Sequence, residues 1–296
     1  MIIRNLKDLA WRLLDVFPYK LHYLILWIYS KKTLPNLLNP RDYSEYIFRD
    51  NFFHNHDAHA YLADKYMVRD YVEKRGLSNS LTKLYGVWDD ASKINFSELP
   101  EKFALKCNHS CAMNIICKDK SELKIPSVVA QLNSWLKQEH SIFYEPHYRK
   151  IKPLIICEEY LADKFGNFPM DYKIHCVDGQ PIFIQCCFDR TETSVGKRAI
   201  YSTDWEDLHF VIEDYHYSNE QLPKPIGLEK MLKQAAILSK GLDYVRVDFY
   251  DLDGRVVFGE MTLTPMGGWL SYFKPEALRL MGDNIRDNLR NKQSDV

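Results

Sequence analysis

The sequence lacks three features: an excess of charge of one sign, a low-complexity composition, and a long apolar run. Its 296 residues carry 39 lysines and arginines against 40 aspartates and glutamates, a formal net charge of −1. This balance gives no overall positive field for binding nucleic acid, so we expect no nucleic-acid partner. Glycine and proline number only 12 and 13, too few for a collagen-like or low-complexity chain. With 46% hydrophobic residues, the composition is that of a globular protein with a substantial core.

Membrane-spanning segments and paired cysteines are equally scarce. The most apolar early stretch, LHYLILWIY at 21–29, is well short of the roughly 20 residues that span a bilayer. The seven cysteines are an odd number, and several lie in strand-like apolar runs, where reduced cysteine packs as a small hydrophobic side chain. The start of the chain does not resemble a signal peptide. These features favour a cytoplasmic location.

Residues 1–59 are expected to form a helical N-terminal segment. Apolar residues recur at helical spacing between positions 6 and 17, Pro18 ends that pattern, and 21–29 begins a second helix. Two interpretations are open. The helices cap the main domain, or residues 1–30 contact the inner face of a membrane peripherally, since Trp11, Trp27 and several tyrosines suit headgroup depth.

From residue 60 to 290 the patterns of helices and strands alternate in what we interpret as the main domain. Helices are predicted over 65–74, capped by Asp64 and ended by Gly76, and over 127–137 and 228–239. Strands are predicted over 103–107, 114–117 and 154–158, with hairpins over 172–187 and 245–262 that turn at Asp178-Gly179 and Asp253-Gly254. Antiparallel hairpins mixed with helices indicate an α+β fold.

The last hairpin carries two acids whose relative position depends on its turn. Asp248 alternates with apolar residues on the first strand, and Glu260 lies on the return strand. A two-residue loop would put the two acids on opposite faces, and a three-residue loop ending in Gly254 would put them on one face. Two carboxylates on one face would suit Mg²⁺ that bridges phosphates. An exposed strand face with local ion pairs is the alternative.

Charged residues also interrupt other apolar runs. Lys106 lies in FALKC and Lys173 in DYKIHC; such strand lysines either reach solvent or point toward a bound anion. In LIICEEYL, an apolar strand ends at Glu158 and Glu159. A strand end beside a carboxylate could bind an adenine edge and a ribose, although an ordinary strand end has the same sequence.

The order of these motifs resembles the ATP-grasp superfamily, and specifically its TupA-like branch, which is associated with teichuronopeptide and other surface-polysaccharide biosynthesis. The resemblance spans about residues 60–275 and rests on DKYMVRDYV, FALKCNHS, IICEEYL, DYKIHCVDGQPIFIQ and VRVDFYDLDGRVVFGEMTLTP. It implies an ATP-grasp fold, in which two α+β lobes clasp ATP, and it implies ATP and Mg²⁺ as cofactors.

The resemblance also implies roles for individual residues. The metal ligands would be Asp248, Glu260 and Thr262, the last at a position that is usually asparagine. The catalytic residues that stabilise developing charge would be Arg246 and Lys173. The residues that hold the phosphates would be Lys106 and Lys173, and those that contact adenine and ribose would be Glu158, Glu159, Tyr160 and Leu161. The motif DKYMVRDYV also contains Lys65, to which we assign no role.

The loop NHSCAM, residues 108–113, departs from the family, whose members tend to carry glycine there. A loop without glycine has less conformational freedom, so we expect slower closure over the phosphates or direct contributions from His109 and Ser110. A zinc site formed by the cysteines and histidine of residues 107–117 is a weaker alternative, because the paired C-x₂-C spacing is missing.

The activity that the resemblance implies is ligation. A substrate carboxylate would attack the γ-phosphate of ATP to form an acyl phosphate, and an amine would then displace phosphate to give an amide. A uronic-acid sugar in a capsule, teichuronic acid or O-antigen is the predicted carboxylate. A sugar kinase, a glycosyltransferase and a catalytically inactive nucleotide-binding scaffold are the alternatives.

Overall fold

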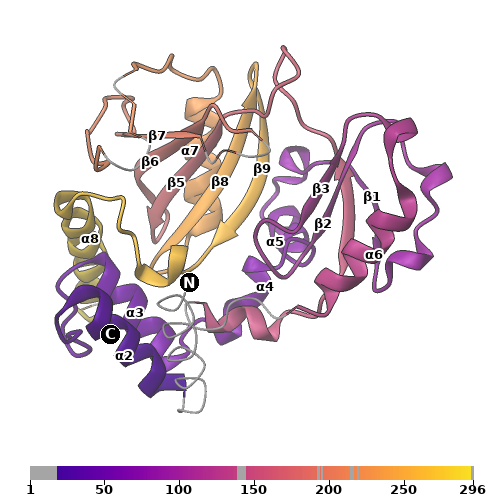
Figure 1. The fold of residues 1–296 in the computed structure, drawn as a ribbon. Helices are drawn as coiled ribbons and strands as arrows, with labels where there is room; N and C mark the ends of the chain where they lie inside the picture. Colours follow the sequence, from indigo (N-terminus) through magenta and orange to yellow (C-terminus); the bar gives the residue numbers. More distant parts are fainter. Residues whose placement is uncertain are drawn as a thin grey trace.

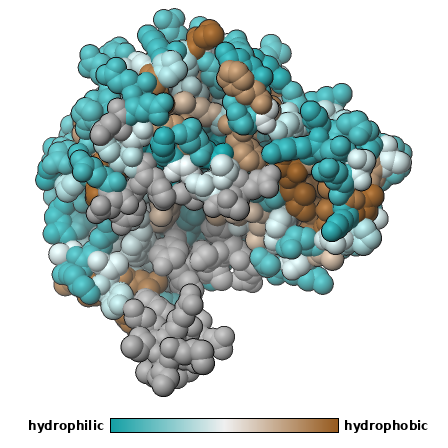
Figure 2. Space-filling view, turned by 45° about the horizontal axis from the view of Figure 1, so that its top comes forward, coloured by the Kyte–Doolittle hydropathy of each residue, from teal (hydrophilic) through white to brown (hydrophobic). Residues whose placement is uncertain are grey.

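The protein contains two antiparallel sheets surrounded by helices, which confirms the α+β class. A computed structural model describes residues 19–138, 145–191, 194, 196–213, 217–218 and 220–294. In Figure 1 the two sheets lie on opposite sides of the molecule, with α4 (Ala60–Ala63) and α5 (Val68–Lys74) between them. The face shown in Figure 2 is mostly hydrophilic, and its largest apolar patch lies over the lobe of the first sheet. The short 3₁₀ helices are η1 (Asp57–His59), η2 (Ser78–Ser80), η3 (Ala91–Lys93), η4 (Phe96–Glu98), η5 (Lys120–Glu122), η6 (Pro146–Lys150) and η7 (Pro265–Gly268).

The first sheet has four strands in the order β1-β4-β2-β3. Their bounds are β1 (Leu84–Trp88), β2 (Phe103–Cys107), β3 (Asn114–Cys117) and β4 (Ile155–Glu159). Leu105 and Cys157 form one apolar core with Leu132 of α6 (Ile125–Leu136). The predicted strands over 103–107 and 114–117 are confirmed, whereas β1 was not predicted from the sequence.

The second sheet has five strands in the order β7-β6-β5-β8-β9. Their bounds are β5 (Asp171–Val177), β6 (Gln180–Phe188), β7 (Lys197–Tyr201), β8 (Val245–Leu252) and β9 (Arg255–Thr262). Val247 and Phe249 pack on one face of this sheet with residues of α5 and α7 (Leu228–Ser239). Both predicted hairpins and the predicted helix over 228–239 are confirmed.

The predicted start of the helix at Lys65 is wrong. The carboxylate of Asp64 accepts hydrogen bonds from the backbone N–H groups of Tyr66 and Met67, at 2.8 and 3.1 Å. These bonds stabilise a turn ahead of the helix, and α5 itself begins at Val68. Because of this turn, Lys65 lies outside the helix and next to the loop that follows β2, to whose Asn108 carbonyl its backbone N–H donates at 3.3 Å.

The N-terminal region packs against the other face of the second sheet. It consists of α2 (Tyr19–Lys31) and α3 (Tyr43–Phe53), and α3 contacts the last helix, α8 (Pro275–Ser294). The rings of Tyr23 and Phe48 stack at 4.3 Å between centroids. Trp27, which we expected to suit a membrane headgroup, is instead buried against Phe48. The predicted helical pattern over residues 6–17 lies outside the described residues. No described helix combines the length and apolar character that crossing a membrane requires.

Candidate active site between the two sheets

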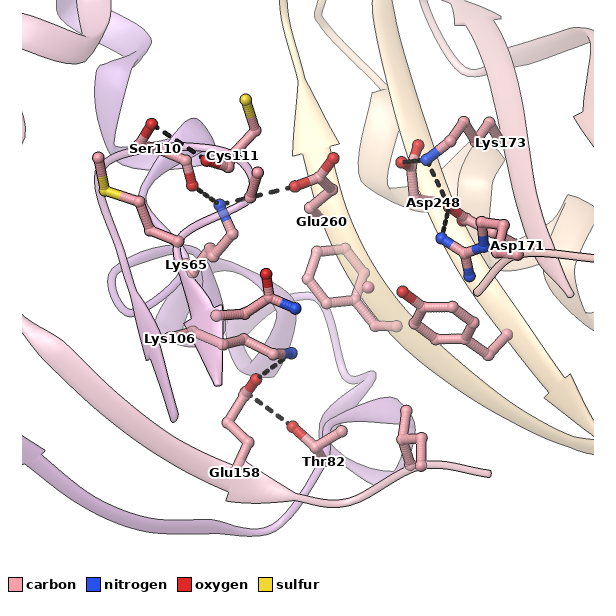
Figure 3. A pocket seen from close by; sticks show the side chains of 18 residues that line it. Lys65, Thr82, Lys106, Ser110, Cys111, Glu158, Asp171, Lys173, Asp248 and Glu260 are labelled. Carbon is pink, nitrogen blue, oxygen red and sulfur yellow. Dashed lines mark hydrogen bonds and ion pairs between the residues drawn. The ribbon is translucent and has the colours of Figure 1, made fainter. Parts of the chain in front are cut away.

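A cavity of about 250 Å³ lies between the two sheets and is lined by residues of both (Figure 3). One wall consists of Lys65, the loop after β2, and the strands β2 and β4. The opposite wall comes from β5, β8 and β9. Most of the site residues predicted from the sequence therefore come together here, although they are spread over more than 150 positions of the chain: Lys106, Ser110, Glu158, Leu161, Lys173, Asp248 and Glu260.

The hairpin β8–β9 brings its two acids together through a β-bulge. Its loop has two residues, Asp253 and Gly254, with φ of 51° and 92°. A regular ladder from this loop would put Asp248 and Glu260 on opposite faces, as expected from the sequence. However, Asp248 pairs with Glu260 and the next pair is Phe249 with Phe258, so Gly259 is an extra residue in β9. This bulge reverses the alternation and places both acids on the cavity face.

Glycine suits the position of the bulge because there is little room beside its backbone. A Cβ atom at residue 259 would lie 3.1 Å from the carbonyl oxygen of Asp248. The expectation that only a three-residue loop could unite the acids is therefore wrong. The sequence contained a signal for the alternative, because an isolated glycine inside a strand pattern often marks a bulge.

Cations of the same sheet hold the acid pair. The guanidinium of Arg246 donates to both oxygens of Asp248, each at 2.7 Å, and to Glu260 at 3.0 Å. Lys173 donates to Asp248 as well and forms an ion pair with Asp171 at 2.7 Å. Burial opposes the charge of Lys173, but Asp171 and Asp248 outweigh it and raise the pKa of the ammonium group. Lys173 and Arg246 therefore stay charged beside the acids.

A second charged cluster lies on the wall of the first sheet. The carboxylate of Glu158 accepts hydrogen bonds from Lys106, Arg69 and Thr82, each at 2.8 Å. Burial favours the neutral form of Glu158, yet its three partners prevail and lower its pKa. Burial likewise opposes the charge of Lys106, and Glu158 outweighs it and raises the pKa of that lysine. The cluster presents Lys106 to the cavity as a fixed positive charge.

Arg69 and Thr82 were not predicted as site residues, because their contact with Glu158 joins positions 89 and 76 residues apart. The neighbouring Glu159 has a different partner. It receives two hydrogen bonds of 2.7 Å from Arg255 of β9, so this ion pair joins the two sheets.

Lys65 links the loop after β2 to the opposite wall. The ammonium group of Lys65 donates to the carbonyl oxygen of Ser110 at 2.7 Å and lies 3.8 Å from a carboxylate oxygen of Glu260. Figure 3 shows Glu260 pointing across the cavity toward this lysine. His109 faces a separate cavity of about 580 Å³, and its Nε2 is 3.1 Å from the carbonyl oxygen of Gln138.

A larger cavity of about 650 Å³ adjoins the first and shares six lining residues with it: Lys106, Ala112, Asn114, Leu161, Arg190 and Tyr250. Its other lining residues are mainly apolar or aromatic, among them Ile115, Ile116 and Phe168. Glu159, Tyr160 and Leu161 border this larger cavity, whereas Glu158 borders the smaller, charged one. The two cavities are thus adjacent, the larger one mainly apolar and the smaller one charged.

Asp248 and Glu260 are the residues of the site that could hold a metal ion. Among the described residues, no group of three or more histidines, cysteines, aspartates or glutamates is arranged to hold a metal ion. Thr262 is buried directly opposite Arg246 in the ladder. Cys107 and Cys117 are buried in the core of the first sheet, which argues against the zinc alternative.

Comparison with known proteins gives one family match and several structural similarities. The family model described as TupA-like ATPgrasp matches residues 47–286. Comparison with curated proteins gives no match.

Three solved structures illustrate the structural similarity. The D-alanine–D-alanine ligase from Bacillus anthracis is 17% identical with a TM-score of 0.49, over 79% of this chain and 70% of that chain. The L-amino acid ligase from Bacillus licheniformis is 12% identical with a TM-score of 0.47, over 77% and 50%. The ATP-grasp ligase PsnB, complexed with its minimal precursor, Mg and ADP, is 14% identical with a TM-score of 0.44, over 83% and 66%.

Proposed function

The chain belongs to the TupA-like ATP-grasp family, and from this premise we propose that it is an ATP- and Mg²⁺-dependent ligase that joins a carboxylate to an amine. The family match confirms the resemblance and the ATP-grasp fold predicted from the sequence. The observation that carries the proposal is the direct pairing of Asp248 with Glu260 on the cavity face, opposite Lys106. Paired carboxylates beside fixed cations suit a metal-bound polyphosphate.

The two adjacent cavities suggest how ATP would lie. The apolar cavity, with Ile115, Ile116 and Leu161, suits the base. The charged cavity would then receive the phosphates between Lys106 and Lys173. Asp248 and Glu260 would hold Mg²⁺, which neutralises phosphate charge when bound. Thr262, predicted as a third ligand, and His109 and Ser110, predicted to contact the phosphates, remain predictions.

Binding would exchange the contacts of the acid pair. In this structure Arg246 and Lys173 donate hydrogen bonds to Asp248. When nucleotide binds, each could donate to a phosphate oxygen instead of to Asp248. The substrate carboxylate would attack the γ-phosphorus as its bond to the ADP oxygen breaks, giving an acyl phosphate. The amine would then attack the acyl carbon, lose a proton and expel phosphate. Arg246 and Lys173 would stabilise the negative charge that develops in both steps.

We further propose a uronic-acid sugar or polymer of a surface polysaccharide, such as a capsule, teichuronic acid or O-antigen, as the carboxylate substrate. The TupA-like branch of the family supports this choice. All seven cysteines are free, which favours the reducing cytoplasm as the compartment of the reaction.

The first test is ligand-induced stabilisation. The thermal unfolding of wild type should be measured with Mg-ATP and separately with a Mg-UDP-sugar. A ligand at 100 times its Kd stabilises the folded state by about 2.7 kcal/mol. We expect stabilisation by Mg-ATP, its loss in Asp248→Asn, and its retention in Asp253→Asn, a charge-matched change in the turn of the same hairpin. No response of wild type to saturating Mg-ATP, or a response to UDP-sugar alone, would contradict the proposal.

The second test separates a ligase from a kinase and from an inactive scaffold. ADP release should be measured over many turnovers with glucuronate or galacturonate, with and without a set of amino acids and amino alcohols. A ligase requires the amine for a stable product. ADP release that proceeds to a phosphorylated sugar without an amine would identify a kinase, and ATP binding without turnover under any combination would identify a scaffold.

A further inference from the structure

The outward face of α2 and the loop after it form a surface that the proposed reaction does not use. The inward face of α2 contributes Tyr23, Leu26 and Trp27 to the core. The outward face also carries Lys20 and Ser30, but three of its positions, at the spacing i, i+4 and i+7, are apolar: Leu21 and Ile28, which are exposed, and Ile25, which is partly buried. A surface helix normally directs its apolar side chains to the core and its polar ones outward.

Exposed apolar side chains are concentrated in this part of the molecule. Among the described residues, thirteen large apolar side chains are exposed, and five of them lie between positions 21 and 38. Two are in the loop that follows α2: the exposed fraction of Leu34 is 68% and that of Leu38 is 97%. Phe53, at the end of α3, is also half exposed, and the ammonium group of Lys20 lies 5.4 Å from the centroid of its ring. Exposed apolar side chains concentrated in one segment point to an interaction surface.

The charge of this segment distinguishes between kinds of partner. Residues 19–41 contain four basic residues and no aspartate or glutamate, although the whole chain has a net charge of −1. Arg41 is neutralised by an ion pair with Glu45. Lys20, Lys31 and Lys32 form ion pairs with none of the described residues, and each lies over an aromatic ring of α2 or α3. Lysines beside apolar and aromatic side chains are typical of a surface that binds anionic lipid.

We propose that residues 19–41 dock the protein on an anionic membrane surface, with Leu34 and Leu38 entering the interface and Lys20, Lys31 and Lys32 facing lipid headgroups. This docking differs from the sequence-based expectation in its anchors, because Trp27 is buried and the exposed leucines of the loop take its place. It is independent of the proposed ligase reaction. A second copy of the chain is a poorer fit, because two such lysine-bearing surfaces would repel each other.

The test is flotation of the full-length protein with vesicles of phosphatidylcholine alone and of phosphatidylcholine with 30% phosphatidylglycerol. Wild type should bind the anionic vesicles more tightly, by about fivefold for each contributing lysine at low salt, and the difference should narrow as salt is raised. The double variant Leu34→Ser/Leu38→Ser should bind about tenfold more weakly. The control is Phe165→Ser/Ile226→Ser, which changes two side chains that are 77% and 78% exposed elsewhere on the molecule and should bind as wild type does.

Three outcomes would overturn the proposal. They are no binding of wild type to anionic vesicles at millimolar lipid, equal loss of binding in the test and control variants, and concentration-dependent dimerisation that the leucine substitutions abolish. The thermal midpoints of both double variants, which we expect to match wild type, show whether a loss of binding reflects the surface or the fold.

Discussion

Two hairpins face each other across the candidate active site, and they position their functional residues in different ways. In β8–β9 a two-residue turn and one bulge fix which side chains face the cavity, so the ladder itself places Asp248 opposite Glu260. In β2–β3 the strands are joined by a six-residue loop, 108–113, whose residues lie outside the ladder. Its position depends on contacts with other parts of the chain.

Asn108 makes most of those contacts. Its side chain is fully buried and donates to Asp64 at 2.9 Å and to the carbonyl oxygen of Lys152 at 3.0 Å, while it accepts from the N–H of Leu154 at 2.7 Å. Its backbone carbonyl accepts from the N–H of Lys65 at 3.3 Å. A loop without glycine is thus fixed by side-chain and backbone hydrogen bonds to two distant segments. One wall of the site is therefore set by local strand register and the other by long-range contacts.

The largest effect on stability is expected where a long-range contact involves buried charge. Glu158→Gln leaves Lys106 and Arg69 without their carboxylate, and removing one partner of a buried ion pair costs about 3–5 kcal/mol. Because its three partners lower the folded-state pKa of Glu158, the native carboxylate contributes stability above its unfolded-state pKa, and this contribution is lost as the pH falls. Urea unfolding should therefore show the largest difference between wild type and variant near pH 7 and a smaller one below about pH 4.

The neighbouring Glu159→Gln is the matched control. Its ion pair with Arg255 is more exposed, so its loss should cost less than about 1 kcal/mol. Equal costs for the two substitutions would show that Glu158 does not hold Lys106 in the way we describe.

The next substitution, Gly259→Val, disturbs the register of β8–β9. Gly259→Val places a branched side chain where even a Cβ atom would lie 3.1 Å from the carbonyl oxygen of Asp248. The bulge must then shift, and misplacement of reacting groups by about 1 Å can cost about a hundredfold in rate. We expect ATP turnover to fall by that factor or more, with loss of the thermal shift by Mg-ATP.

Gly254→Ala is the control in the same hairpin. It strains the turn, where φ is 92°, at a cost of about 1 kcal/mol, but it leaves the bulge intact. This variant should be less stable and still bind Mg-ATP. If it loses nucleotide binding as Gly259→Val does, the general stability of the hairpin matters and the bulge does not.

Secondary structure could be predicted from the sequence where it depends on local pattern. Short apolar runs identified β2 and β3, and turn dipeptides identified the hairpins β5–β6 and β8–β9 of the second sheet. Missing were β1, a half-buried edge strand with an irregularity between Leu84 and Gly86, the edge strand β7, and α8. The last helix did carry a signal, since Leu278, Met281, Ile285 and Leu289 recur at helical spacing and pack toward one core.

The candidate site could be predicted where local pattern or family resemblance names a residue. Lys106, Lys173, Asp248 and Glu260 all line the cavity between the sheets. Asp171 could also have been predicted as a site residue, because it shares a strand face with Lys173 two positions later. Arg69 has no such signal, because only the folded chain brings it to Glu158. The placement of Asp248 and Glu260 on one face could not be predicted from alternation, because it depends on the bulge at Gly259.

The last prediction tests the loop that depends on long-range contacts. Asn108→Ala removes three hydrogen bonds and leaves buried polar groups of Asp64, Lys152 and Leu154 without that partner. We expect the free energy of unfolding to fall by about 2 kcal/mol. If the amide also positions the loop, the KM for ATP should rise by more than kcat falls, because the loop wall would be displaced before nucleotide binds. Asn114→Ala, at the exposed start of β3 in the same cavity, should change stability by less than about 0.5 kcal/mol. A loss of stability in Asn108→Ala with an unchanged KM would mean that the amide supports the fold and that the other contacts of the loop, among them those of Lys65, set its position.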